Sequence, residues 1–244
     1  MKTEGVKKVL ILLLVCNLLT LNSFTQQWWL KINEDSTNGT FLDTRDSSIY
    51  IWVKIGCQIW MAQNLNIGEL KLTNKDGQVI DYSSERFCYK DIEENCSIYG
   101  GLYTDYVINQ TTFHEGDRSI CPQGWHLPAV SEWQILFDYL GGDEVAGSAM
   151  KEAGTEHWKK PNAGSTNSSG FTALPDGICL YDENSISFIE MGQRGCFWTS
   201  TDSFSFLYLT KDFQTICLFK NKGRIIRDKS FGHSALSVRC IKDD

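Results

Sequence analysis

The chain has 244 residues, of which 42% are hydrophobic and 22% are charged, and this ordinary composition excludes a wholly disordered protein. Its 23 lysines and arginines are outnumbered by 30 aspartates and glutamates, so the formal net charge is -7. An acidic balance of this kind argues against nucleic acid as a partner. No two of the four histidines lie within five residues of each other, which excludes a local histidine-based metal motif.

The N-terminus predicts an export signal. Basic residues precede an apolar run at 9–21, which is too short to span a bilayer but suits a signal peptide. Small residues before Gln26 predict cleavage there, so that 1–25 is the signal peptide. The alternatives are an uncleaved anchor and a lipoprotein acylated at Cys16; the bulky Val15 and the apolar run beyond Cys16 count against the latter. We expect export to the cell surface, periplasm or extracellular space, with no transmembrane span in the mature chain.

The remaining residues are predicted to form one domain. Residues 26–42 form a polar lead-in, and 43–244 form the domain, because no proline-rich or glycine/serine-rich linker divides it. Two apolar runs, 49–55 and 58–61, flank Gly56–Cys57 and predict a hairpin.

Two helices are expected in the middle of the chain. After Pro128, the residues Trp133, Leu136 and Phe137 share one apolar face at helical spacing. A second helix is predicted over 143–153.

Short strands alternate with turns elsewhere. Residues 66–98 are turn-rich and polar. Short strands are predicted at 171–174, 196–199, 206–209, 215–219, 224–226 and 235–241.

The cysteine count agrees with export. Removal of the signal peptide leaves eight cysteines: Cys57, Cys88, Cys96, Cys121, Cys179, Cys196, Cys217 and Cys240. An even number in an exported chain predicts disulfides, and the absence of any C-x-x-C motif argues against a zinc ribbon or a thioredoxin-type redox site. Cys88 and Cys96 enclose a polar, acidic loop, so we expect a local bridge between them.

Several sequence blocks occur in a distinctive order. They are VKIGCQIWMAQNL at 53–65, YGGLY at 99–103, CPQGWHLP at 121–128, EW at 132–133, GG at 141–142, SGFTALPDG at 169–177, FWTST at 197–201 and SVRC at 237–240. Together they resemble the Fibrobacter succinogenes major paralogous domain family over about 43–243.

The resemblance implies an α+β, C-type lectin-like fold. Its two helices would pack on twisted antiparallel sheets with long irregular loops, stabilised by disulfides. In such folds a disulfide commonly ties the helical region to the last strand, which implies Cys121–Cys240. Of the other four cysteines, Cys179–Cys196 is the preferred pair, and Cys57 and Cys217 are left unassigned.

Candidate sites are few. His126 is expected to be a hydrogen-bonded histidine beside the core rather than a catalytic base, because neither a nucleophile nor a carboxylate partner can be located for it in the sequence. The acidic stretches 91–95 and 182–184 are expected to be solvated loops rather than calcium sites, and the sugar-binding triplets of C-type lectins are absent. The tryptophans are expected in the core rather than on a sugar-binding platform, namely Trp60, Trp125, Trp133 and Trp198.

These observations favour an exported, non-catalytic surface binding or adhesion module whose ligand is polysaccharide or a surface protein. No catalytic, cofactor-binding or metal-binding residue is assigned. One alternative is an enzyme related to formylglycine-generating, sulfatase-modifying oxidases, although Cys217 and Cys240 are too far apart in sequence for the reactive pair such enzymes need. The other is a purely structural envelope protein. The specific ligand, the oligomeric state and the route of attachment remain open at this stage.

Overall fold

The computed structural model describes residues 36–69, 86–110, 120–181, 185–205, 210–230 and 233–243. The chain divides into two units, Met1–Thr37 and Asn38–Asp244, and the fold described below is that of the second. The expected signal peptide and most of the lead-in lie outside the described residues.

A five-stranded sheet contains both the first and the last strands of the fold. Its strands are β1 (Asn38–Asp43), β2 (Ser48–Ile55), β3 (Gln58–Met61), β12 (Ile241–Lys242) and β5 (Trp125–His126), in that order across the sheet. The predicted hairpin is present, with Ile55 opposite Gln58 across the turn. Strand β1 covers the end of the expected polar lead-in, 26–42, and pairs along its whole length with β2. The sheet therefore begins earlier than the sequence pattern indicated.

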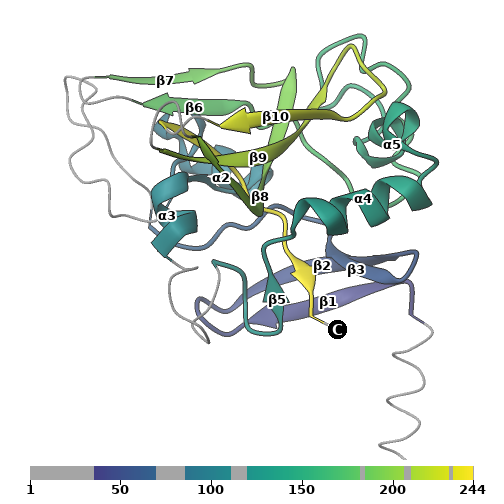
Figure 1. Cartoon of the computed structure of the whole chain (residues 1–244), viewed down its shortest axis with the longest axis horizontal. Coiled ribbons are helices and arrows are strands. Elements are labelled where there is room, and N and C mark those ends of the chain that lie inside the picture. The colour runs from purple at the N-terminus through teal and green to yellow at the C-terminus, as the bar shows by residue number, and fades with distance from the viewer. Residues whose placement is uncertain are drawn as a thin grey trace, which may run out of the picture. The chain divides into compact units, whose positions relative to one another are not determined.

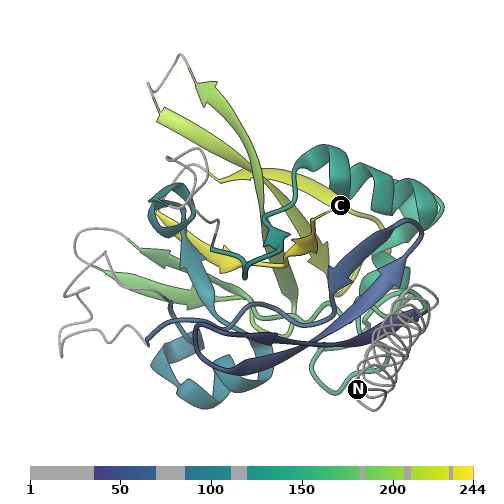
Figure 2. The same ribbon diagram turned by 90° about the horizontal axis from the view of Figure 1, so that it is seen from below.

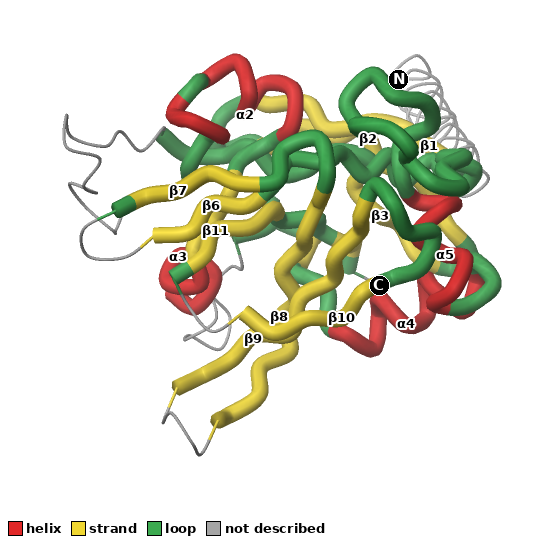
Figure 3. The backbone as a smooth tube through the Cα atoms, turned by 90° about the horizontal axis from the view of Figure 1, so that it is seen from above, coloured by secondary structure: helices red, strands yellow, loops and turns green. Residues whose placement is uncertain are grey.

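A seven-stranded sheet forms the second layer. It runs β10 (Ile226–Ser230), β9 (Thr210–Phe219), β8 (Arg194–Ser205), β11 (Ser234–Ser237), β6 (Ile178–Tyr181) and β7 (Ile186–Ile189), and β4 (Leu102–Thr104) also pairs with β11. The pairs are antiparallel except β11 with β8, which is parallel. In Figures 1 and 2 the purple-to-blue strands β1–β3 lie in one layer, which the short yellow strand at the C-terminus joins, and the green-to-yellow strands β6–β10 lie in the other. Figure 3 shows β8 and β9 extending together away from the other strands.

Three strand predictions are wrong. Residues 171–174 contain only an isolated bridge, between Ala173 and Lys151, because the backbone carbonyls of Phe171 and Thr172 accept hydrogen bonds from an arginine side chain instead of from a strand. Strand β10 only begins where the predicted 224–226 strand ends. The predicted 235–241 strand is two strands, since the chain crosses there from one sheet to the other. The predicted strand at 206–209 lies outside the described residues.

Both predicted helices are present as α4 (Val130–Tyr139) and α5 (Asp143–Met150). Three short helical segments were not predicted: η1 (Tyr89–Asp91), α2 (Glu93–Tyr99) and α3 (Asp105–Gln110). Each is too short for a repeating apolar face to be visible in the sequence. None of the helices in the described ranges has the length and apolar character needed to cross a membrane.

An aromatic cluster joins α4 to both sheets. The rings of Trp60 from β3 and Trp133 from α4 lie 4.6 Å apart, and Trp133 also packs on Phe171 and on Phe197 of β8. All four side chains are fully buried. The expectation that the tryptophans belong to the core is confirmed, since Trp125 and Trp198 are buried as well.

Candidate functional site

A cleft of about 510 Å³ opens beside the start of β2. We call it the β2–α2 cleft. Its walls come from β2, from the segment after β3, from the end of α2, from Glu152 and from the loop after Gly170, with Arg239 beneath. Its lining includes Ser48, Ile49, Tyr50, Ile51, Gln63, Asn64, Asn66, Ser97, Ile98, Gly100, Glu152, Gly170, Thr172, Leu174 and Arg239.

Arg239 and Asn64 form the floor of the cleft. The Arg239 side chain is fully buried and donates from Nε (3.0 Å) and Nη2 (2.6 Å) to Oδ1 of Asn64. Its Nη1 donates to the carbonyls of Met61 (3.1 Å) and Phe171 (2.5 Å), and the guanidinium lies 4.3 Å from the centre of the Phe171 ring. Burial lowers the pKa of Arg239 to about 9, so the group stays charged at neutral pH. Its role is to fix the floor rather than to react.

Asp176 completes this buried network. Its Oδ2 accepts from Asn64 Nδ2 (3.3 Å) and from the hydroxyl of Ser237. Burial raises the pKa of Asp176 well above its usual range, and the positive charge of Arg239 opposes that shift. The carboxyl is only 1% exposed, so ligands in the cleft do not reach it.

Gly100 lets the end of α2 approach the floor. Its φ is +83°, and a Cβ at this position would lie 2.5 Å from Cβ of Asn64. Any side chain here would therefore both strain the backbone and displace Asn64. This explains one glycine of the YGGLY block.

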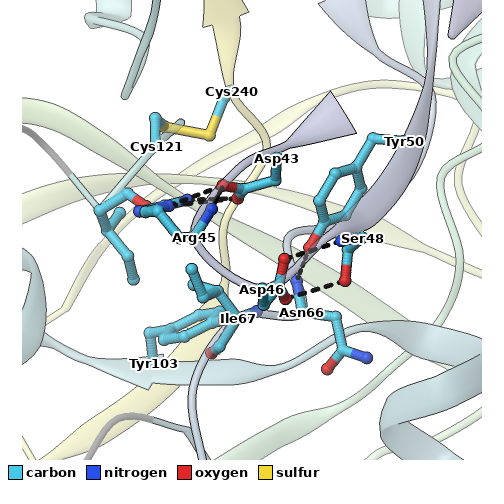
Figure 4. A network of polar contacts seen from close by, with 11 residues as sticks. Asp43, Arg45, Asp46, Ser48, Tyr50, Asn66, Ile67, Tyr103, Cys121 and Cys240 are labelled. Carbon is cyan, nitrogen blue, oxygen red and sulfur yellow. Dashed lines mark hydrogen bonds and ion pairs between the residues drawn. A yellow bond between two sulfur atoms is a disulfide. The ribbon is translucent and has the colours of Figure 1, made fainter. Parts of the chain in front are cut away.

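Two tyrosines hold the edge of the cleft in place (Figure 4). The hydroxyl of Tyr50 accepts the Asn66 N–H (2.9 Å), and that of Tyr103 accepts the Ile67 N–H (2.8 Å) while donating to the Ile67 carbonyl (2.9 Å). Burial raises the pKa of Tyr50 to about 12, so it remains a neutral hydroxyl. Sequence reasoning missed this arrangement because the partners are backbone groups distant in sequence.

The same view shows a neighbouring ion pair. The guanidinium of Arg45 contacts the buried carboxylate of Asp43 at 2.7 Å, and its Nη1 donates to the carbonyl of Ile120 (2.8 Å) (Figure 4). Ile120 precedes Cys121, so the pair links the end of β1 to the chain segment that enters β5.

Exposed isoleucines surround the polar floor. Ile49 and Ile51 of β2 are 66% and 46% exposed, and Ile98 of α2 is 50% exposed. The cleft thus presents amide and hydroxyl groups inside and aliphatic side chains at its edge. Such a mixture suits a ligand with both polar and apolar faces.

His126 lies outside this cleft, between two carboxylates. Its Nε2 is 2.8 Å from Oε1 of Glu132 and its Nδ1 is 2.6 Å from Oδ1 of Asp243. The hydrogen bond to Glu132 is the main cause that raises the pKa of His126 to about 9. Because the ring is protonated at neutral pH, it is unsuited to act as a general base there. The second oxygen of Glu132 accepts the Ala129 N–H (2.8 Å) and caps α4.

The expectation of a solvated loop at 91–95 is wrong, because this stretch forms the end of η1 and the first turn of α2. Glu93 pairs with Arg86, and the amide of Asn95 donates to the Tyr89 carbonyl (2.8 Å). The other acidic stretch, 182–184, lies outside the described residues. Among the residues that the structure describes, a metal-sized group of ligand atoms occurs instead at Glu152, Glu156 and His157.

A family model described as the Fibrobacter succinogenes major domain matches residues 53–242. The chain belongs to this family. No curated protein and no solved structure matches the chain. The matched residues of this chain include Asn64 and Arg239 on the floor of the β2–α2 cleft. The cleft-wall residues 48–51 come before the matched range.

Three disulfides stabilise this Fibrobacter succinogenes major domain. The expected pairs Cys88–Cys96 and Cys121–Cys240 are present, with Cα atoms 5.0 Å and 5.9 Å apart. The preferred pair Cys179–Cys196 is wrong, because Cys196 is bonded to Cys217. These two residues stand directly opposite each other in the β8–β9 ladder. That register could not be read from the sequence.

Among the described residues, the two cysteines without a disulfide lie in different sheets. Cys57 is exposed in the β2–β3 turn of the five-stranded sheet. Cys179 belongs to β6 of the other sheet and is fully buried among Phe87, Leu102 and Ala235. Burial raises the pKa of its thiol, which keeps it in the unreactive protonated form.

Proposed function

We propose that this protein is an exported, non-catalytic binding module that holds polysaccharide in the β2–α2 cleft. The observation that carries the proposal is the combination of a preformed cleft of about 510 Å³ on a rigid buried floor, accessible polar side chains in its lining such as Gln63 and Thr172, and an aliphatic edge. A sugar chain presents hydroxyl groups at its ring edges and C–H groups on its ring faces, which match these two kinds of lining. A site fixed by buried side chains also loses little entropy on binding.

A C-type lectin-like fold is part of this proposal. Strand β12 lies between β3 and β5, so the end of the domain returns beside its start. The Cys121–Cys240 bridge reinforces that closure next to the helical region. Both features agree with the architecture that the family resemblance implies, although fold alone is a weak guide to function.

Export is supported from two directions. The basic and apolar N-terminus has the pattern of a signal peptide, and three disulfides are typical of proteins that fold in an oxidising compartment. The oxidase alternative gains no support, because the two free thiols lie on different sheets and one is buried.

A polysaccharide array tests the function. The secreted protein is compared with Ile98→Asp, which places a charge at the cleft edge, and with Val145→Asp on α5 as a control of equal exposure, 50%. We expect wild type and the control to bind the same glycans and Ile98→Asp to bind at least about tenfold more weakly. Undiminished binding by Ile98→Asp would exclude this cleft. A blank array with folded protein would favour the purely structural alternative.

A further inference from the structure

The loop that follows α5 gathers three side chains that commonly ligate metals. One ligand atom from each of Glu152, Glu156 and His157 lies within 4.8 Å of the other two. Nδ1 of His157 is 2.8 Å and 3.0 Å from the two carboxylate oxygens of Glu152. The side chains of Glu152 and His157 are mostly shielded, whereas Glu156 is exposed. The group is therefore compact and open to solvent on one side.

The loop is held rigidly around these side chains. Trp158, next to His157, is buried and donates from Nε1 to the carbonyl of Ala173 (2.9 Å). The amide of Asn162 donates to the carbonyls of Glu152 (2.9 Å) and Gly154 (2.6 Å). Buried anchors on both sides fix the backbone from which the three ligands project, as a preorganised metal site requires.

Asn162 also provides a second, independent observation. Its Oδ1 is buried and has no hydrogen-bond partner in the described protein, while the same amide group holds the Glu152 backbone. Buried acceptors of this kind are normally satisfied by ordered water or an ion with its water shell. The loop that carries the three ligand side chains therefore contains one buried acceptor that the described polypeptide leaves unsatisfied.

We propose that Glu152, Glu156 and His157 bind a divalent transition-metal ion such as Zn²⁺. One imidazole nitrogen and two carboxylates suit this class of ion, whereas Ca²⁺ takes six to eight oxygen ligands. The ion replaces the direct contact between His157 Nδ1 and the Glu152 carboxylate, and water fills the remaining coordination position. Glu152 also lines the β2–α2 cleft, so the ion stands at the edge of that cleft. The site does not depend on the ligand proposed for the cleft.

Titration calorimetry with ZnCl₂ on EDTA-treated, dialysed protein tests this site. We expect one ion per chain for wild type and at least about tenfold weaker binding for His157→Gln and for Glu156→Gln. His233→Gln, at an exposed histidine outside this loop, is the control and should bind as wild type does. Glu156 is exposed, so its variant tests the site without threatening the fold.

Two further measurements make the outcome decisive. Co²⁺ bound in place of Zn²⁺ should give visible absorption bands that disappear in His157→Gln. Titration with CaCl₂ should show weaker binding than ZnCl₂. The proposal is overturned if wild type fails to bind Zn²⁺ at millimolar concentration, if His157→Gln binds it equally well, or if Ca²⁺ binds more tightly.

Discussion

Arg239 shows at the scale of one residue how a buried charge can organise a fold. Its guanidinium contacts the carbonyl of Met61 in β3 and the carbonyl of Phe171 in a loop, and it shares Asn64 with Asp176. A buried cation is costly unless its donors are satisfied, and here the partners come from two separate segments, 61–64 and 171–172. The floor of the cleft is therefore rigid because those segments meet on one side chain.

Trp133 is the largest packing anchor of α4. It is fully buried, and its indole N–H has no hydrogen-bond partner among the described residues, so packing dominates its contribution. We predict that Trp133→Ala lowers the free energy of unfolding by about 3–5 kcal/mol, as large core truncations do. Ile135→Ala, at an exposed position of the same helix, should cost less than about 0.5 kcal/mol. Urea denaturation checks both values; a Trp133→Ala loss below about 1 kcal/mol would contradict the packing described.

His126 should make stability depend on pH. Its pKa is about 9 in the folded protein against 6.5 in an unfolded chain, so the folded state binds the proton more tightly. Its contribution is fully present below pH 6.5 and is lost as pH rises through 9. We predict that the free energy of unfolding falls less between pH 6.5 and 9 in His126→Gln than in wild type. His233→Gln should show the same fall as wild type. Urea denaturation between pH 6 and 10 is the measurement, and equal pH slopes for wild type and His126→Gln would disprove the interpretation.

At the scale of elements, the disulfides act over very different chain lengths. Cys121–Cys240 spans 119 positions and Cys88–Cys96 only 8. The chain-entropy model gives about 5 kcal/mol for the long closure and about 2.5 kcal/mol for the short one.

We therefore predict a larger loss of stability for Cys121→Ser/Cys240→Ser than for Cys88→Ser/Cys96→Ser. Thermal denaturation of the two double variants, each compared with wild type, is the check. The reverse order would show that native-state strain, not chain closure, dominates.

Elements with their own periodic signal could be predicted from the sequence. Helix α4 has a repeating apolar face, and the β2–β3 hairpin has two strand-like runs around a glycine turn. By contrast, α2 is a single short helix held by the Cys88–Cys96 bridge, and α3 is shorter still. Prediction of the Cys196–Cys217 disulfide required the register of β8 against β9. That register is set by the hairpin as a whole and not by the residues near either cysteine.

The candidate site was largely beyond prediction for a related reason. Arg239 and Asn64 each lie in a recognisable family block, but nothing in the sequence says that these blocks meet. The tyrosine hydroxyls bond to backbone groups distant in sequence, and Glu152 reaches the cleft wall only through the tertiary fold. Only the tertiary fold brings such groups together, so composition and spacing could identify the family without locating the cleft.

At the scale of the whole molecule, the crossing from β11 to β12 ties the two sheets together. Residues 238–240 leave β11 in the seven-stranded sheet and enter β12 in the five-stranded sheet. On the way, the carbonyls of Val238 and Cys240 accept the N–H groups of Leu65 (2.9 Å) and Met61 (3.0 Å). The segment also carries Arg239 and Cys240, which is bonded to Cys121. Residues 238–240 therefore fix both the closure of the fold and the floor of its cleft.

The central claim is that the β2–α2 cleft is the binding surface of this domain. The most direct measurement is an amide NMR titration of ¹⁵N-labelled secreted protein with an oligosaccharide fragment of the glycan that the array identifies. The account predicts shifts concentrated at Ile49, Ile98 and Thr172, with Val145 unaffected. Shifts confined to other surfaces, such as the exposed face of α4, would contradict it.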